Sequence, residues 1–375
     1  MSNSFQTLSE ETRLPQCNIW NKWDPLKAVM LGDIWGPEFF ENIKDPKVRK
    51  PLQRITEETR EELSNFERVL KDFGCKVIRP LISKSDRLEK YINEAGEVKI
   101  PRNALQPRDN QIVIGNKLWT DNADNPGIVL GLRHNGYKIY DMFEFATSSD
   151  NYLKMENFSH EKHPPTSANV FLIGNDAYVN YTCCMPMSAL QNMFGDIRIN
   201  VLDNPYSHND GCFHPIKPGA ILSVFDFQNY SKTFENWDVC YLEREPWTKA
   251  KEFDAWKRKT DGKWWHPEAV SNPEFAHYVN AWLDEWVGYV EETVFDVNVL
   301  VLDEYHVCVS SLKNKTVLEF LKKHKMEPVY VPWRHRYFWD GGLHCITLDL
   351  YREGEKQDYF PNRQEPIILE EYLIK

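Results

Sequence analysis

The chain has 375 residues, of which 42% are hydrophobic and 27% are charged, as is usual for a globular protein. Its net charge of -11 argues against a nucleic-acid-binding protein, which normally carries a basic face. An acidic surface suits an enzyme that takes cationic small-molecule substrates. Because no run of about 18 apolar residues occurs, we expect no transmembrane helix and no membrane partner.

The N-terminus and the cysteines indicate the compartment. The polar start, Met1–Ser4, lacks the apolar stretch of a secretory signal. The eight cysteines are scattered and form no Cys-x-x-Cys pair, which favours reduced thiols over a disulfide framework or a zinc site. We therefore expect a cytoplasmic protein.

Hydrophobic periodicity predicts alternating strands and helices along the chain. Residues 1–20 are polar and predict a flexible lead-in before the first strand, which lies within Trp23–Gly32. A long amphipathic helix from Lys47 to Phe73 follows, with Gly74 as its stop. A strand follows in Lys76–Pro80, and the predicted later helices are Pro126–Asn135, Met187–Phe194 and Thr316–His324.

One short pattern recurs five times: a polar residue, often Asp or Asn, then an apolar strand, a turn and another strand. The copies cover residues 108–115, 167–174, 208–223, 296–303 and 340–350. With helices between them, these units predict a ring of five ββαβ modules around one axis, each with its polar residue at the central end. The alternative is an ordinary mixed α/β chain with turn residues before its strands.

Residues 237–290 differ from the rest because seven tryptophans stand among many charges. We interpret this segment as a helical insertion that covers one side of the ring, either as a lid over the substrate or as surface packing. No linker or low-complexity segment divides the chain. The sequence therefore predicts one domain, residues 21–375.

Cys345 lies between a glycine pair, Gly341–Gly342, and a strand in which Ile346, Leu348 and Leu350 alternate with more polar residues. The alternation has the period of a half-buried strand. A cysteine at a loop-to-strand junction is well placed for a nucleophile. A buried structural cysteine is the alternative.

His208 and Asp210 stand at another loop-to-strand junction, where a histidine can move protons near neutral pH and a carboxylate can hold a cation beside it. A polar surface loop would look the same. Metal binding by His208, Asp210 and His214 would need a further ligand. Asp109, in a third junction, can pair with a planar guanidinium or serve as a turn residue.

These four residues, Cys345, His208, Asp109 and Asp210, fit attack by a thiolate at a guanidinium carbon. The aspartates would hold the guanidinium nitrogens, and the histidine would protonate the departing amine. The chemistry needs no cofactor and no metal. Nucleotide-binding and serine-hydrolase motifs are absent.

The chain resembles the arginine amidinotransferases, which belong to the pentein, or α/β-propeller, superfamily of five ββαβ modules around a pseudo-fivefold axis. The resemblance runs from Trp23 to Gly354. It is carried by Gly341–Asp349, Pro107–Asp109, His208-x-Asp210 with Pro218–Gly219, and Asn298–Glu304. It implies that Cys345 is the nucleophile, that His208 is the general acid and base, and that Asp109 and Asp210 bind the guanidinium.

Three positions depart from the family pattern. Thr166, in the segment Thr166–Asn169, stands where the family has an acidic residue that orients the histidine. Phe227 falls near the arginine that binds the donor carboxylate in the glycine enzyme, and Glu291 and Glu292 fall near the small residues that line that same site. By this alignment Thr166, Asn169, Glu291 and Glu292 border the substrate. An acidic pocket without arginine would repel a free carboxylate.

The sequence therefore predicts an amidinotransferase that transfers an amidino group from a guanidine donor, with arginine as the first candidate, to an acceptor amine through Cys345. The alternatives are a guanidine-modifying hydrolase related to arginine deiminase, and a binding protein that has lost catalysis. Members of the family are often dimers, so a homodimer is one assembly to expect.

Overall fold

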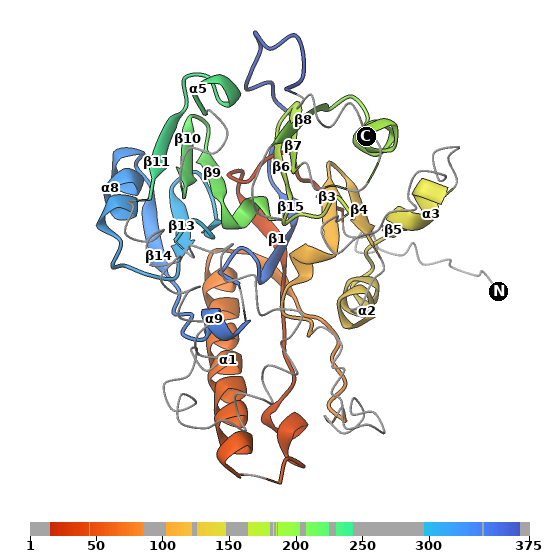
Figure 1. Cartoon of the computed structure of the whole chain (residues 1–375), viewed down its shortest axis with the longest axis vertical. Coiled ribbons are helices and arrows are strands. Elements are labelled where there is room, and N and C mark those ends of the chain that lie inside the picture. The colour runs from red at the N-terminus through yellow and green to blue at the C-terminus, as the bar shows by residue number, and fades with distance from the viewer. Residues whose placement is uncertain are drawn as a thin grey trace, which may run out of the picture.

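The computed structural model describes residues 16–44, 46–85, 87, 103–121, 126–147, 164–180, 183, 185, 187–202, 208–224, 230–242, 296–339 and 341–367. These residues form five sheets, each of three strands (Figure 1). Every sheet repeats one arrangement, in which two antiparallel strands are followed by a third that runs parallel to the middle one.

Four modules are continuous in sequence. The first contains β3 (Gln111–Ile114), β4 (Lys117–Thr120), α2 (Pro126–His134) and β5 (Ile139–Asp141). The second contains β6 (Val170–Ile173), β7 (Asp176–Asn180), α4 (Met187–Phe194) and β8 (Arg198–Leu202). The third contains β9 (Phe213–Lys217), β10 (Ala220–Ser223), α5 (Tyr230–Thr233) and β11 (Asp238–Tyr241). The fourth contains β12 (Leu300–Val301), β13 (His306–Val309), α8 (Lys315–Lys323) and β14 (Glu327–Tyr330).

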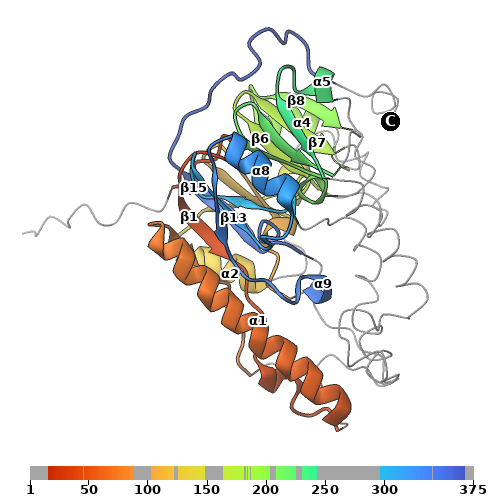
Figure 2. The same ribbon diagram turned by 90° about the vertical axis from the view of Figure 1, so that its left-hand side faces the viewer.

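The fifth module joins the two ends of the chain. β15 (Thr347–Arg352) pairs antiparallel with β1 (Leu26–Leu31), which pairs parallel with β2 (Lys76–Ile78). The crossover between β1 and β2 contains η2 (Pro37–Phe40) and the long helix α1 (Pro46–Asp72). Figures 1 and 2 show α1 extending well beyond the sheets. The expected five ββαβ modules are confirmed, and pairing of the terminal strands closes the ring.

Local sequence explains the module plan. Parallel pairing needs a long crossover, which a helix supplies, whereas a tight turn is enough for the antiparallel pair. In the first three modules that turn contains a glycine with positive φ: Gly115 at 55°, Gly174 at 63° and Gly219 at 83°. Glycine adopts this backbone conformation without the steric penalty of a side chain.

The strands and helices predicted from periodicity are largely confirmed. The expected helix at Lys47–Phe73 is α1, and the expected helices near residues 126, 187 and 316 are α2, α4 and α8. The structure adds η4 (Pro107–Asp109), α3 (Met142–Thr147), η6 (Asn209–Gly211) and α9 (Arg336–Trp339). No helix among the described residues is long and apolar enough to cross a membrane.

Three expectations need correction. β15 is not half-buried, because Thr347 and Asp349 on its polar face are as buried as its leucines. The segment 237–290 does not begin as a helix, since β11 occupies its start; the rest, 243–290, lies outside the described residues. The lead-in is shorter than 1–20, because Asn18 and Ile19 already form bridges with Tyr351 and Gly115. The single-domain boundary 21–375 stays a prediction.

Candidate active site

Hydrogen bonds between neighbouring modules hold the residues at the central ends of the sheets. Each bond joins the start of the first strand of one module, or the loop before it, to the same region of a neighbouring module. Around the ring, they run from Ser167 N to Gln111 O, Asp210 N to Ala168 O, Asn298 Nδ2 to Asp210 O, Cys345 N to Asn298 Oδ1, and Arg108 Nε to His344 O. The segments that carry Asp210, Asn298 and Cys345 therefore lie next to one another, whereas Asp340 of the fifth repeat lies outside the described residues.

Cys345 precedes β15 and is held by Asn298. The Asn298 Nδ2 donates to Cys345 Sγ at 3.0 Å. The Asn298 Oδ1 accepts from the backbone N–H groups of His344 and Cys345 at 2.9 and 3.0 Å. One amide side chain thus fixes both the backbone and the sulfur of the candidate nucleophile.

The glycine pair before Cys345 permits close packing. A Cβ on Gly342 would lie 2.6 Å from Asn298 Oδ1, and a Cβ on Gly341 would lie 2.9 Å from Gln106 Nε2 and 3.1 Å from Cys345 Cβ. Gln106 Nε2 itself donates to Trp339 O at 2.8 Å. A side chain at either glycine would push apart the groups that position the thiol.

Asp210 lies beside the thiol, inside the protein. Its Oδ2 is 3.6 Å from Cys345 Sγ and 2.8 Å from His344 Nδ1. Burial raises the pKa of Asp210 to about 6, and the charge of Asp109 adds to this rise, whereas His208 and Arg108 oppose it. Asp210, Asp109 and His208 are therefore close enough for their charges to interact, as the sequence constellation required.

The surroundings that the protein itself provides keep the Cys345 thiol neutral. Burial, followed by the charges of Asp210 and Asp109, raises the pKa of Cys345 well above the usual value for cysteine. The hydrogen bond from Asn298 acts in the opposite direction but does not overcome them. A thiolate at this position therefore needs an added positive charge nearby.

Both aspartates have an unused oxygen. Within the part of the chain that the structure describes, Asp109 Oδ1 and Asp210 Oδ1 are buried and have no hydrogen-bond partner. Buried carboxylate oxygens are normally satisfied, so each orphan calls for an explanation. A bound cation with N–H donors would supply both partners and compensate the two negative charges.

Beneath the site lies a buried ion cluster around Asp349. Its Oδ1 is 2.8 Å from Arg108 Nη2, its Oδ2 is 2.8 Å from Arg352 Nε, and Lys22 Nζ is 3.9 Å from Oδ2. Burial alone would raise the pKa of Asp349, but the charges of Arg352, Lys22 and Arg108 lower it. The negative charge of Asp349 thus compensates the buried charges of Arg108, Arg352 and Lys22 near the loop that carries Cys345.

Other expected site residues have different places. The Asn169 side chain holds a turn, accepting from Thr166 N at 2.8 Å and donating to Pro164 O at 3.1 Å. The Thr166 hydroxyl lies 3.4 Å from Asn169 Oδ1 in the same buried turn. Glu291 and Glu292 lie outside the described residues.

His208 is half-buried and precedes η6, the short turn that carries Asp210. The metal alternative for His208, Asp210 and His214 finds no support, since no group of three or more His, Cys, Asp or Glu in the described ranges could hold an ion. Sequence reasoning did not assign roles to Asn298 and His344. The sequence signal for Asn298 was its position in the fourth repeat, which matches that of Asp210 in the third. The signal for His344 was that it directly precedes Cys345.

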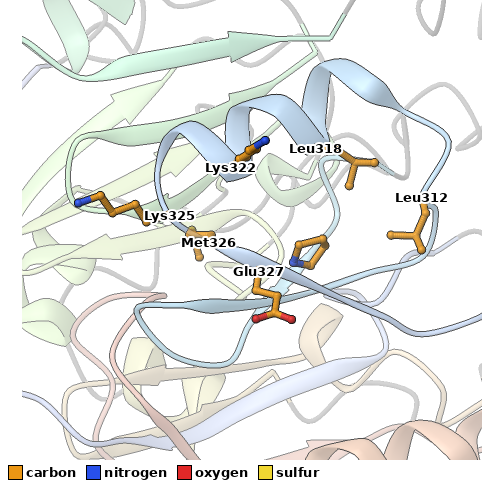
Figure 3. A pocket seen from close by; sticks show the side chains of 7 residues that line it. Leu312, Leu318, Lys322, Lys325, Met326 and Glu327 are labelled. Atoms are coloured by element: carbon orange, nitrogen blue, oxygen red, sulfur yellow. The ribbon is translucent and has the colours of Figure 1, made fainter.

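A pocket of about 490 Å³ lies elsewhere, on the fourth module (Figure 3). It is lined by residues of α8, β14 and their connections: Leu312, Leu318, Lys322, Lys325, Met326, Glu327 and Pro328. None of the residues around Cys345 contributes to it. We therefore assign the chemistry to the ring axis and not to this surface pocket.

Two known proteins are similar to the chain in sequence. No protein-family model matches the chain. The chain is 22% identical to the L-arginine:L-lysine amidinotransferase of Pseudomonas savastanoi pv. phaseolicola, over 92% of this chain and 96% of the relative. It is also 22% identical to the mitochondrial glycine amidinotransferase of Xenopus tropicalis, over 93% of this chain and 86% of the relative.

Solved structures share the fold. An amidinotransferase of saxitoxin biosynthesis from Microseira wollei superimposes with a TM-score of 0.60 at 19% identity, covering 92% of this chain and 99% of the other. The inosamine-phosphate amidinotransferase of Streptomyces griseus gives 0.56 at 17% identity, with coverages of 92% and 99%. The agmatine deiminase of C. jejuni gives 0.52 at 14% identity, with coverages of 93% and 100%. The chain thus has the five-module pentein fold of these solved structures, and it is similar in sequence to two amidinotransferases.

Proposed function

We propose that this protein is an amidinotransferase that moves an amidino group from a guanidine donor, with L-arginine as the first candidate, to an acceptor amine. The observation that carries the proposal is the pair of buried, unpartnered oxygens, Asp109 Oδ1 and Asp210 Oδ1, on two carboxylates whose charges act on the Cys345 thiol. A guanidinium is planar, permanently cationic and rich in N–H donors, so it matches two such acceptors.

The donor guanidinium supplies the charge that Cys345 lacks. Within the protein itself, burial and then the two carboxylates keep the pKa of Cys345 raised. A bound guanidinium neutralises the carboxylates and favours the thiolate, which is the nucleophilic form. The thiol therefore becomes reactive when the donor is present, which limits side reactions of the free enzyme.

In the first half-reaction, Cys345 gives its thiol proton to His208, and the resulting thiolate forms a bond to the central guanidinium carbon. The bond from that carbon to the substituted nitrogen then breaks, and the electron pair stays on the nitrogen, which takes a proton from His208. With arginine, the departing amine is ornithine. The amidino group stays on the Cys345 sulfur as an S-substituted isothiouronium cation, and Asp109 and Asp210 hold its nitrogens.

In the second half-reaction, an acceptor amine attacks the same carbon. His208 takes a proton from that amine, the carbon–sulfur bond breaks, and Cys345 leaves as the thiolate. The product is a new guanidine. The sequence of steps is ping-pong, since the first amine departs before the second one reacts.

We further propose that at least one substrate is a plain or cationic amine, and not glycine paired with arginine. The chain is strongly acidic, and two carboxylates already face the site. A free carboxylate would be repelled there unless a cation pairs with it. Initial rates with arginine and glycine, lysine, ornithine or diamines test this idea; a clear preference for glycine would contradict it.

The amidino intermediate provides the main test. The protein is incubated with arginine without acceptor, quenched in acid and analysed by intact mass, with Cys345→Ser as the matched control. We expect a mass gain of one amidino group on Cys345, absent from the control. If no guanidine donor labels Cys345, the amidinotransferase proposal fails and a binding protein on the same scaffold is favoured.

A hydrolase with the same nucleophile is the second candidate, because the fold is shared by an agmatine deiminase. Water would then take the place of the acceptor amine, giving urea if ornithine leaves first, or citrulline if ammonia leaves first. Product analysis separates the two. Turnover of arginine that depends on an added amine supports transfer, whereas turnover at the same rate without any amine supports hydrolysis.

A further inference from the structure

His344 is buried against Asp210 at the centre of the site. Its Nδ1 lies 2.8 Å from Asp210 Oδ2, and the exposed fractions of the two side chains are 1% and 0%. Asp210 Oδ1 has no partner among the described residues, so the two oxygens of this carboxylate have different surroundings.

The proton in this hydrogen bond belongs to the imidazole. Burial, and then the charge of Arg108, holds the pKa of His344 well below its usual value, so the ring is neutral. An ionised carboxylate can only accept, and a neutral imidazole carries one N–H. Nδ1 is therefore the donor, and Nε2 is the bare nitrogen, which has no partner in the described part of the chain.

The ring of His344 cannot easily turn away from Asp210. Its backbone N–H donates to Asn298 Oδ1 at 2.9 Å, and its carbonyl accepts from Arg108 Nε at 2.8 Å. The ring of His344 also packs edge-on against the ring of His214, with 4.5 Å between the ring centroids and an interplanar angle of 89°. The tilted ring of Phe171 lies 5.9 Å away. The direction of the Nδ1–H bond is thus set by the fold.

We infer that His344 is a positioning residue for Asp210: it occupies Oδ2 and leaves Oδ1 free to bind the guanidinium of the donor. This inference rests on the function proposed above. A carboxylate on a short side chain can rotate about its last bond, and the fixed His344 donor, which lies closer to Oδ2 than the Cys345 sulfur does, selects which oxygen faces the ligand. His344 itself does not need to touch the substrate.

His214 provides the internal contrast. It is buried beside His344 to the same degree, but neither of its ring nitrogens has a hydrogen-bond partner among the described residues. Replacing a buried group that makes no hydrogen bond by an apolar one of similar shape costs little. His214→Phe therefore serves as a control for changes in packing alone.

The test uses four variants of the full chain. His344→Asn places an amide N–H near the position of Nδ1, whereas His344→Gln places it near Nε2, and His344→Phe keeps a ring but removes the donor. His214→Phe is the packing control. We measure kcat and KM for the guanidine donor, and the orientation of Asp210 in crystals of each variant; melting curves show that each is folded.

We expect His344→Phe and His344→Gln to raise KM for the donor by about tenfold or more, with a smaller change in kcat, and His344→Asn to restore KM to within about threefold. His214→Phe should leave KM unchanged. Equal KM values for the Asn and Gln variants, or an unchanged KM in His344→Phe, would overturn the inference.

The crystals separate this inference from the function on which it rests. If no guanidine is a substrate of the unchanged protein, the proposed function has failed, and the orientation of Asp210 decides about His344. An Asp210 carboxylate that turns in His344→Phe and not in His344→Asn supports the positioning role. An Asp210 carboxylate with the same orientation in all variants refutes it.

Discussion

Asn298 and Cys345 are joined by two hydrogen bonds, one at each end of the same amide. Asn298 Nδ2 donates to Cys345 Sγ at 3.0 Å, and Asn298 Oδ1 accepts from Cys345 N at 3.0 Å. The candidate nucleophile comes from the fifth module and the amide from the fourth. Closing the ring of modules therefore also fixes the position of the Cys345 sulfur.

This relationship predicts the effect of Asn298→Leu. Without the amide, the thiolate loses a donor and the pKa of Cys345 rises further, because the hydrogen bond from Asn298 lowers it. A hydrogen bond to a charged group contributes about 1.5–3 kcal/mol, so formation of the amidino intermediate should slow by roughly 10- to 100-fold. Quenched-flow mass spectrometry of Cys345 measures that rate.

The control for this prediction is Asn314→Ala. Asn314 caps α8 by accepting from Val317 N, so its loss lowers stability without reaching the site. If Asn298→Leu formed the intermediate as fast as the unchanged protein, the amide would have no role in activating the thiol.

Asp109→Asn should change two properties in opposite directions. The charge of Asp109 raises the pKa of Cys345, so its removal lowers that pKa and makes the thiol of the empty enzyme more reactive. The same change removes one acceptor for the guanidinium, and KM for the donor should rise by about tenfold or more. Alkylation by iodoacetamide across a pH series and steady-state kinetics measure the two effects.

Asp303→Asn is the matched control, because that carboxylate bonds to His306 on the fourth module, away from the thiol. It should change neither measurement. A slower alkylation rate in Asp109→Asn would contradict the electrostatic account of the site, even if KM rose.

Donor binding should weaken in acid through Asp210. Its pKa is raised to about 6, so on lowering the pH this carboxylate takes up its proton well before an ordinary aspartate does. The neutral form cannot pair with a guanidinium. The dissociation constant of the donor should therefore be nearly constant above the pKa of Asp210 and rise about tenfold for each pH unit below it.

Calorimetry with Cys345→Ser measures this dependence without turnover. In the double variant with Cys345→Ser and Asp210→Asn, the donor should bind more weakly, and its dissociation constant should no longer follow the same pH dependence. A pH-independent dissociation constant in Cys345→Ser between pH 5 and pH 7, roughly one unit on either side of the Asp210 pKa, would show that Asp210 does not titrate in this range.

The sequence predicted the modules because each one repeats a local pattern. Five polar residues before apolar strands, and helices with clear periodicity, identified the ββαβ unit and the residues at its central end. No local sequence pattern predicts that β15 and β1 pair and so close the fifth module. This closure depends on pairing between Asp349 and Val29, which are far apart in the chain.

The same distinction applies to the site. Cys345, Asp109 and Asp210 could be named because thiols and carboxylates carry a recognisable chemistry. The roles of Asn298 and His344 depend on contacts across modules, and asparagine and histidine near turns have many ordinary uses. The alternating pattern of β15 predicted that Asp349 would be exposed. Asp349 is buried instead, and its carboxylate pairs with Arg108 and Arg352.

Asp349→Asn should destabilise the whole fold. Asp349 compensates Arg108 and Arg352, each at 2.8 Å, and all three side chains are at most 1% exposed. Removing one partner of a buried ion pair leaves uncompensated charge and costs about 3–5 kcal/mol. Because the pKa of Asp349 is lowered, its stabilising effect is present above the usual aspartate pKa and is lost only in strong acid.

The loss should therefore be similar at any pH near neutrality, and it can be measured by urea unfolding of the unchanged protein and Asp349→Asn. The control is Glu353→Gln, which removes an ion pair with Lys27 at 3.2 Å in which the side chains are 66% and 46% exposed. Such a pair contributes about 0–1 kcal/mol. Equal unfolding free energies for Asp349→Asn and Glu353→Gln would mean that Asp349 is not the anion on which burial of the two arginines depends.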